Sequence, residues 1–227
     1  MILERGTAGY PATLLERCSL EVSARDPSVA DRLSGRLKPG GDVFIGFPPG
    51  ENHHRILQTA AAVRRVGLNP VPHVVARNLA SYTQLDDYLR RASGEAGVTR
   101  ALAVAGDAVR PTGPFESSLA LIETGLFEKH GIRSLGIAGH PEGTRHLTRQ
   151  ALDAALASKL ELAERHGLEL WIATQFCFEA AAIVAWLRAI RAGGIGLPVR
   201  IGLAGPASVA TLLKFAVRCG IGNSLRA

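Results

Sequence analysis

The chain has 227 residues, of which 47% are hydrophobic, and its mean hydropathy is +0.13, so it can form one domain with a large core. Its formal net charge of +6 comes from basic residues spread over predicted helices, and only 5% of its residues are aromatic, which argues against a nucleic-acid-binding protein. No stretch reaches the ~18 apolar residues of a membrane helix, and the N-terminus has no secretory signal pattern. Three cysteines without CxxC or Cys/His spacing argue against a disulfide framework or a zinc site. We therefore expect a cytoplasmic protein that holds no metal.

Seven short apolar runs recur along the chain, and their starts lie about 30 residues apart, which is the length of one strand–helix unit in a (β/α)₈ barrel. Continuous apolar runs are typical of parallel strands that are covered on both faces. The predicted strands are Cys18–Ser23, Asp42–Phe47, Asn69–Val75, Arg100–Gly106, Ser134–Gly139, Leu168–Phe176 and Pro198–Gly205.

Amphipathic segments between these runs predict helices. Asn52 is the expected N-cap of the helix after the second strand, and Ser81 with Gln84 forms a capping-box pattern before the next one. The longest helix is expected to begin near Thr144. Further helices are expected within residues 115–131, 179–194 and 208–220, and each of the predicted helical segments ends in glycine, which suits a left-handed C-cap.

Alternating strands and helices predict an α/β fold with a parallel sheet and right-handed crossovers. A doubly wound open sheet is the competing architecture, but the first strand is followed by no Gly-rich phosphate loop. We therefore expect one TIM (β/α)₈-type barrel domain over residues 1–227. No eighth strand can be found after the seventh helical segment, so this chain is expected to lack that strand.

Two acidic residues at strand ends are candidates for catalysis, because a barrel places its active site at the C-terminal ends of its strands. Glu21 lies within an apolar run, where a carboxylate is costly unless it is paired or functional. If Glu21 faces the mouth of the barrel, burial should raise its pKa and make it a proton donor; the alternative is a structural ion pair, for example with Arg25. Asp107 follows Gly106, and it either serves a ligand or caps the next turn.

Three other polar residues end strands. His73 is either a ligand contact or a satisfied core histidine, and His140 lies in a Gly/Pro turn where ligand contact and plain packing are both open. Gln175 is the most suggestive, because a buried amide must satisfy both its donor and its acceptor, and an amide matches the edge of a heterocycle such as a pterin. The alternative for Gln175 is a network with neighbouring strand ends.

Taken together, these residues resemble the methylenetetrahydrofolate reductase family over most of the chain. The run SLEVSARD resembles the family's first strand, PHVVAR its Pro-His strand, AGD its Arg-Gly-Asp turn, AGHPEG its Tyr-Pro-(Lys/Glu)-Gly turn, and ATQFCF its Thr-Gln-(Phe/Leu)-Phe run. Each motif is short, but their order and spacing across five strands make the combination more specific than any one of them.

The resemblance implies an oxidoreductase that reduces 5,10-methylenetetrahydrofolate to 5-methyltetrahydrofolate with NADH or NADPH through FAD. It implies that Glu21 donates the proton, that Asp107 stabilises charge near the pterin, and that Gln175 binds the substrate. The flavin contacts implied by the resemblance are His73, Gly106, Asp107, His140, Asp153 and Lys159. We expect the small-molecule folate to be the main partner, no nucleic acid or membrane to be bound, and the protein to form a homo-oligomer.

Several departures from the family pattern keep other functions open. Ala105 replaces the arginine of the Arg-Gly-Asp turn, Thr144 stands where the family has a histidine, and Leu156 replaces a polar residue. These changes lie at flavin contacts, so a flavin-free folate-dependent one-carbon enzyme is the alternative. The missing eighth strand also leaves open a non-catalytic folate-binding subunit.

Overall fold

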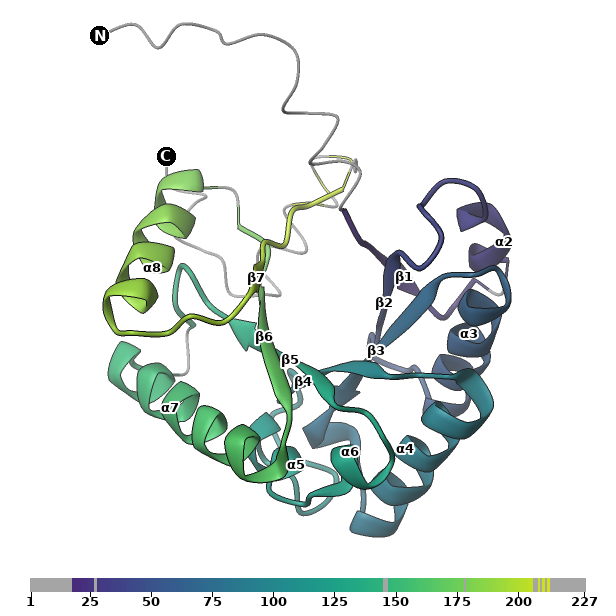
Figure 1. Ribbon diagram of the computed structural model, residues 1–227, viewed down its shortest axis with the longest axis horizontal. Coiled ribbons are helices and arrows are strands. Elements are labelled where there is room, and N and C mark those ends of the chain that lie inside the picture. Colours follow the sequence, from purple (N-terminus) through teal and green to yellow (C-terminus); the bar gives the residue numbers. More distant parts are fainter. Residues whose placement is uncertain are drawn as a thin grey trace, which may run out of the picture.

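Seven parallel strands form one curled sheet in the order of the sequence, with the helices on its outer side (Figure 1). The computed structural model describes residues 18–26, 28–144, 147–177 and 179–205, together with residues 208, 210 and 212. Every neighbouring pair of strands is parallel, so each connection is a crossover from one end of the sheet to the other. The predicted α/β class and barrel type are confirmed, and no eighth strand is present among the described residues.

The strands match the predicted runs with small differences at their ends. They are β1 (Leu20–Ser23), β2 (Asp42–Gly46), β3 (Asn69–Val75), β4 (Arg100–Val104), β5 (Ser134–Gly139), β6 (Glu169–Thr174) and β7 (Val199–Arg200). The last strand is much shorter than the predicted Pro198–Gly205, because only two of its residues pair with β6. Beyond β7, Leu203 is 75% exposed, so this apolar segment is not covered by other described residues.

The helices show which local signals were reliable. They are α2 (Val29–Leu33), α3 (His53–Arg65), α4 (Tyr82–Ala96), α5 (Ser118–Ile122), α6 (Leu126–Lys129), α7 (Arg149–His166) and α8 (Ala180–Ala192), with the 3-10 turn η1 (Ala76–Asn78) after β3. Asn52 caps α3 by accepting from the backbone N–H of Arg55, as predicted. Ser81 accepts from the N–H of Gln84, whose side chain accepts in turn from the N–H of Ala80.

Two helix predictions were wrong. The longest helix does not begin near Thr144 but at Arg149, where the side chain of Thr148 caps it. The segment 115–131 is not one helix, because Gly125 takes a φ of +66° and divides it into α5 and α6. The helix predicted over residues 208–220 lies almost entirely outside the described residues.

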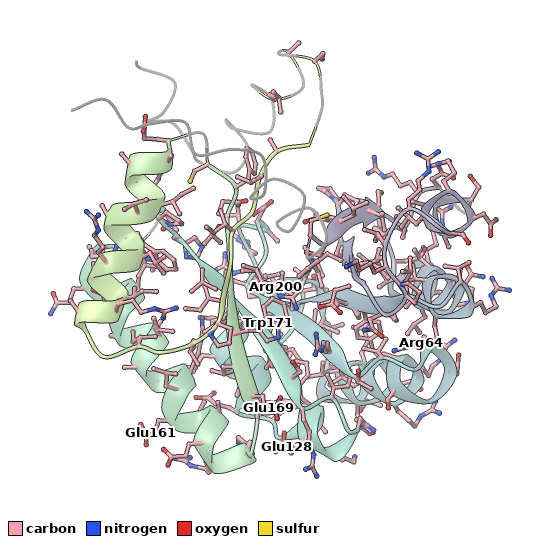
Figure 2. The ribbon with its side chains drawn as sticks, turned by 45° about the horizontal axis from the view of Figure 1, so that its top comes forward. Arg64, Glu128, Glu161, Glu169, Trp171 and Arg200 are labelled. Atoms are coloured by element: carbon pink, nitrogen blue, oxygen red, sulfur yellow. The ribbon has the colours of Figure 1, made fainter. Side chains whose placement is uncertain are left out.

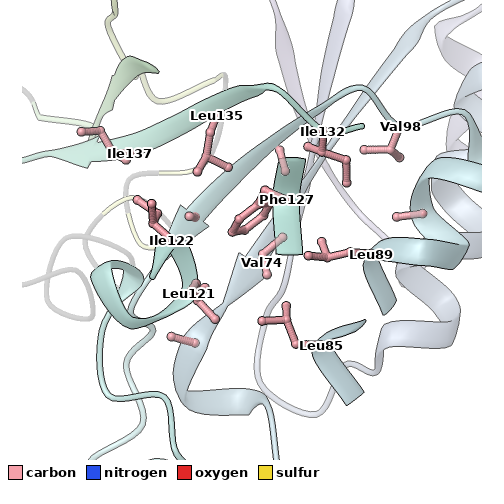
Figure 3. Packing of buried hydrophobic residues seen from close by; sticks show 14 of the residues in the cluster. Val74, Leu85, Leu89, Val98, Leu121, Ile122, Phe127, Ile132, Leu135 and Ile137 are labelled. Atoms are coloured by element: carbon pink, nitrogen blue, oxygen red, sulfur yellow. The ribbon is translucent and has the colours of Figure 1, made fainter. Parts of the chain in front are cut away.

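The main core lies between the convex face of the sheet and the helices (Figure 3). Side chains alternate along a strand, so every second residue of a strand points outward to this layer. Ile45 of β2, Val74 of β3 and Leu135 of β5 are all fully or almost fully buried there. Phe127 of α6 is fully buried in the same cluster. Burial of each large apolar side chain contributes roughly 1.5–3 kcal/mol, so this layer is the main source of stability.

A second, smaller cluster fills the concave face of the sheet. Phe44 of β2, Val71 of β3, Leu102 of β4 and Trp171 of β6 form it. Trp171 fits because its neighbour on β5 is Gly136, where an added Cβ would lie only 2.4 Å from the indole ring. Any larger residue at this position would displace the indole from the inside of the barrel.

An ion-pair network that includes Arg200 crosses the concave face. Figure 2 shows Arg200 close to Trp171. The carboxylate of Asp42 is only 7% exposed, and its Oδ2 lies 3.0 Å from Arg100 Nη1 and 2.6 Å from Arg200 Nη2. Arg200 also covers the ring of Trp171, with its guanidinium carbon 5.0 Å from the ring centroid. Asp42 therefore joins β2 to β4 and to β7 across the inside of the half-barrel.

We predict that Asp42→Asn destabilises the protein by about 1.5–3 kcal/mol, because it removes the charge of a buried carboxylate that pairs with two half-exposed arginines. The loss should be measured as the free energy of unfolding in urea on the full chain.

Asp87→Asn is the matched control, since Asp87 pairs with Arg90 on the exposed surface of α4 and such pairs contribute about 0–1 kcal/mol. Equal losses in the two variants would contradict a structural role for the Asp42 network.

Candidate functional site

The alternation of side chains along the strands places several predicted site residues on the concave face. Glu21 is opposite Phe44 in the β1–β2 register, and His73 is opposite Leu102 in the β3–β4 register, so both belong to the inward row. Gln175 continues the inward row of β6, because its N–H still donates to the carbonyl of Gly139 at 2.8 Å. The C-terminal end of the half-barrel therefore collects these polar residues, as the sequence predicts for a barrel.

Glu21 lies at the rim of this concave face. Its side chain is 65% exposed, and its Oε2 lies 4.0 Å from Nε2 of His73. An added Cβ at Gly46 would come within 2.9 Å of the other carboxylate oxygen, so the glycine makes room for Glu21. The expected burial of Glu21 is not observed. The alternative ion pair with Arg25 is not observed either, since that guanidinium donates to the carbonyl of Pro49.

His73 is more deeply placed than Glu21. The ring lies edge-on to Phe44 with centroids 6.3 Å apart, and Nε2 is buried without a hydrogen-bond partner among the described residues. Burial lowers the pKa of the imidazole, and the nearby carboxylate of Glu21 opposes this shift. His73 is therefore a neutral ring at neutral pH, with one polar atom that no described protein group satisfies.

Asp107 lies on an exposed loop after β4, next to Gly106. Gly106 has a φ of +94°, and an added Cβ would lie 2.4 Å from a methyl group of Val75, so no other residue fits there without strain. The close packing of Gly106 on β3 fixes where the loop leaves the sheet. It thereby fixes the start of the segment that carries Asp107.

Arg77 fixes the rest of this loop, and the sequence reasoning did not identify it. Its backbone N–H donates to the carbonyl of Ala105, and its guanidinium donates to the carbonyls of Ala108 at 2.8 Å and Glu116 at 3.0 Å. The carbonyl of Arg77 accepts from the N–H of Thr112. The available signal was the arginine at the end of the PHVVAR run, directly after a strand.

His140 and Lys159 lie near one another between β5 and α7. Both are half-buried, and burial lowers the pKa of each side chain; the charge of Lys159 lowers the pKa of His140 further. Asp153 of the same helix is exposed, and its carboxylate accepts from Arg149 at 3.1 Å. The structure thus brings two of the three predicted flavin contacts of this region together, and directs the third to a surface ion pair.

Gln175 adjoins the turn after β5. Its Oε1 accepts from the N–H of Phe176 at 3.1 Å, and its amide nitrogen has no hydrogen-bond partner among the described residues. A hollow of only about 10 Å³ separates Gln175 from His140 and the 141–143 turn, which is roughly the space of one water molecule. The amide nitrogen is therefore available to a ligand that approaches from the concave face.

The described part of the chain shows neither a metal-binding cluster nor a membrane span. No cluster of three or more His, Cys, Asp or Glu residues within it could hold a metal ion. None of the described helices has the length and apolar character to cross a membrane. Cys18 and Cys177 are free thiols, and Cys219 lies outside the described residues.

No protein-family model matches the chain. Among solved structures, dihydropteroate synthase from Thermus thermophilus is 17% identical with a TM-score of 0.53, and the match covers 88% of this chain and 77% of that one. At this identity the similarity shows the fold alone: the chain has the fold of a TIM-barrel enzyme.

Two other solved structures match with a TM-score of 0.40, which is too low to support an argument. A sugar phosphate isomerase/epimerase from Parabacteroides distasonis is 13% identical, over 90% of this chain and 93% of that one. A citrate synthase is 10% identical, over 91% and 92% of the two chains. The resemblance to methylenetetrahydrofolate reductases therefore stays a prediction.

We predict that Arg77→Met loosens the loop of residues 105–116, because two charge-assisted hydrogen bonds to backbone carbonyls are lost, at a cost of about 1–3 kcal/mol. Amide hydrogen exchange should rise in this loop more than elsewhere. Arg90→Met, at an exposed pair on α4, is the control. Unchanged exchange in residues 105–116 would contradict the role of Arg77.

A second prediction concerns pH. Burial lowers the pKa of His53, His73 and His140 below 6.5 in the folded protein. As the pH falls through 6.5, these histidines bind protons in the unfolded chain while they stay neutral in the folded protein. The free energy of unfolding therefore falls on acidification, by at most about 1.4 kcal/mol per pH unit for each proton.

Urea unfolding between about pH 7.5 and pH 5.5 tests this prediction. The pKa of Asp26 is lowered from 3.8 to about 2, so this carboxylate stays ionised over the whole range and does not contribute to the change in stability. Stability that stays constant or rises on acidification would contradict the prediction.

Proposed function

We propose that this chain is a methylenetetrahydrofolate reductase-like oxidoreductase that uses NADH or NADPH to reduce 5,10-methylenetetrahydrofolate. The observation that carries the proposal is the pair of inward-facing residues Glu21 on β1 and His73 on β3, with Gln175 at the end of β6. Barrels host many reactions, so the argument rests on these side chains and not on the fold. The motifs around the same residues support it.

Glu21 is the proposed proton donor. The five-membered ring of the substrate opens to an iminium only when its leaving nitrogen receives a proton, and a positioned carboxylic acid supplies it. Glu21 is 65% exposed without a ligand, but a flat pterin over the concave face would displace water from the carboxylate and favour its protonated form. Gly46 leaves the space in which that carboxyl group can turn toward the ligand.

Asp107 and Gln175 are the proposed substrate contacts. A carboxylate near the iminium stabilises its developing positive charge, which suits Asp107 on the loop fixed by Gly106 and Arg77. The pterin edge offers both donors and acceptors, and Gln175 has an amide nitrogen with no described partner. Together these contacts would hold the reacting carbon over the concave face.

The proposed cofactor is FAD, and when bound it would pass the hydride from the nicotinamide to the folate. The residues on the concave side fit such a group. His73 has an unsatisfied buried nitrogen, Gly106 holds the loop that carries Asp107 against β3, and Lys159 beside His140 has no ion-pair partner among the described residues. Asp153 fits less well, because Arg149 holds it on the exposed side of α7.

A flavin-free folate enzyme is the second candidate. The observation that favours it is the same Asp153–Arg149 ion pair, which removes one implied flavin contact, together with Ala105 and Leu156 at two others. In that case the nicotinamide would pass its hydride directly, or a one-carbon group would be transferred. The absorption spectrum of the purified full chain separates the two: a visible flavin band supports the first candidate, and a colourless folate-binding protein the second.

The remaining parts of the proposal concern the setting of the protein. We propose that it acts in the cytoplasm as a homo-oligomer, with a small-molecule folate as its partner rather than a nucleic acid or a membrane. The net charge of +6 suits a polyglutamate tail or the phosphates of a cofactor.

The decisive experiment measures NADH or NADPH oxidation that depends on 5,10-methylenetetrahydrofolate, with added FAD. We expect Glu21→Gln to lower the rate of the folate half-reaction by about 10²–10⁴-fold, which is the contribution of a general acid. Gln175→Ala should instead mainly weaken substrate binding.

Glu95→Gln serves as the control, since it removes a carboxylate from an exposed pair with Arg91 on α4. Absence of folate-dependent oxidation in the unmodified protein, with and without FAD, would overturn the proposal.

A further inference from the structure

The proposed function leaves open what the contact between His73 and Glu21 does. Nε2 of His73 points to the carboxylate of Glu21 at 4.0 Å, and neither group has another charged or hydrogen-bonding partner among the described residues. We infer that His73 is the positioning residue of Glu21: it holds the protonated carboxyl group by accepting its hydrogen bond at Nε2. This inference rests on the proposed function, because it assigns the partner of the proposed proton donor.

The surroundings of His73 favour this role over a plain core position. A core histidine satisfies its buried nitrogens with protein groups, whereas Nε2 of His73 is buried and unsatisfied. The ring rests edge-on against Phe44, which fixes its plane. Glu21 is the one charged group that acts on the imidazole among the described residues.

In the structure, Nε2 of His73 and the carboxyl group of Glu21 are too far apart for a hydrogen bond. A hydrogen bond between the two groups needs about 2.7–3.0 Å, so the carboxyl group must move toward the ring by about 1 Å. Gly46 of β2 lies between the strands that carry Glu21 and His73, and its lack of a side chain leaves the space through which the carboxyl group reaches the ring. A ligand that covers the mouth excludes water and strengthens such a hydrogen bond.

The proton balance of the inferred step is simple. The inferred step requires the neutral imidazole with its proton on Nδ1, the tautomer in which Nε2 is an acceptor. The carboxyl proton of Glu21 goes to the leaving nitrogen of the substrate, and the carboxylate that remains recovers a proton from water once the product has left. His73 stays neutral throughout and is neither oxidised nor reduced.

The test is an NMR titration of the histidine rings by long-range ¹H–¹⁵N correlation, on the full chain without ligand. The signal of His73 is assigned by its loss in His73→Gln. In Glu21→Gln the carboxylate that opposes the lowered pKa of His73 is gone, so this pKa should fall below its value in the unmodified protein.

Glu95→Gln removes an equal charge from the exposed surface of α4 and should leave the titration of His73 unchanged. The same titration of His73 in both variants would overturn the inference, whether or not the protein reduces folate. Conversely, a coupled pair in a protein without folate-dependent turnover would overturn the proposed function and leave the pair itself intact.

The rate of the folate half-reaction distinguishes a positioning role of His73 from a role in packing alone. His73→Phe keeps an aromatic ring beside Phe44 but loses the acceptor, while His73→Gln restores an acceptor at a similar reach. We expect the folate half-reaction to slow at least about tenfold in His73→Phe, with partial recovery in His73→Gln and a changed pH profile. Equal losses in both variants with an unchanged pH profile would show that the ring acts by packing alone.

Discussion

The concave face of this half-barrel depends on one carboxylate, that of Asp42, which is almost fully buried and pairs with Arg100 and Arg200. The pairing of the strands follows the order of the sequence, but this network joins β2 directly to β7. It fixes the curvature of the sheet where no described eighth strand closes it. Two guanidinium groups on one carboxylate also leave a net positive charge inside, next to the rings of Phe44 and Trp171.

The layers above this network explain why polar groups can gather at the C-terminal end. Phe44, Leu102 and Trp171 fill the middle of the concave face, so the base of any site is a buried apolar cluster. Glu21 is in register with Phe44 and His73 with Leu102 on the same inward face, and Gln175 lies at the end of β6. A rigid apolar base with a few polar groups above it is the usual construction of a small-molecule site. The apolar layer keeps His73 neutral, and the exposed rim leaves Glu21 free to respond to a ligand.

Local signals predicted most of the fold and part of the site. The strands were found because a buried parallel strand is apolar throughout, and the caps at Asn52 and Ser81 were found because capping is a local interaction. The long helix was placed too early because Thr148, a second threonine, makes the cap. Arg77 and Asp42 were missed because their partners lie far along the chain, and no local pattern identifies such partners. The exposure of Glu21 was also beyond local reasoning, since it depends on what covers the mouth.

The central claim is that the C-terminal end of this half-barrel binds a reduced folate. Calorimetric titration of tetrahydrofolate into the full chain tests it most directly, since it needs neither the hydride donor nor FAD. The account predicts saturable binding that Gln175→Ala weakens by about tenfold or more, as expected when a hydrogen bond of about 1.4 kcal/mol is lost, and that Arg90→Met on α4 leaves unchanged. Absence of binding, or equal affinity in the Gln175→Ala variant, would contradict it.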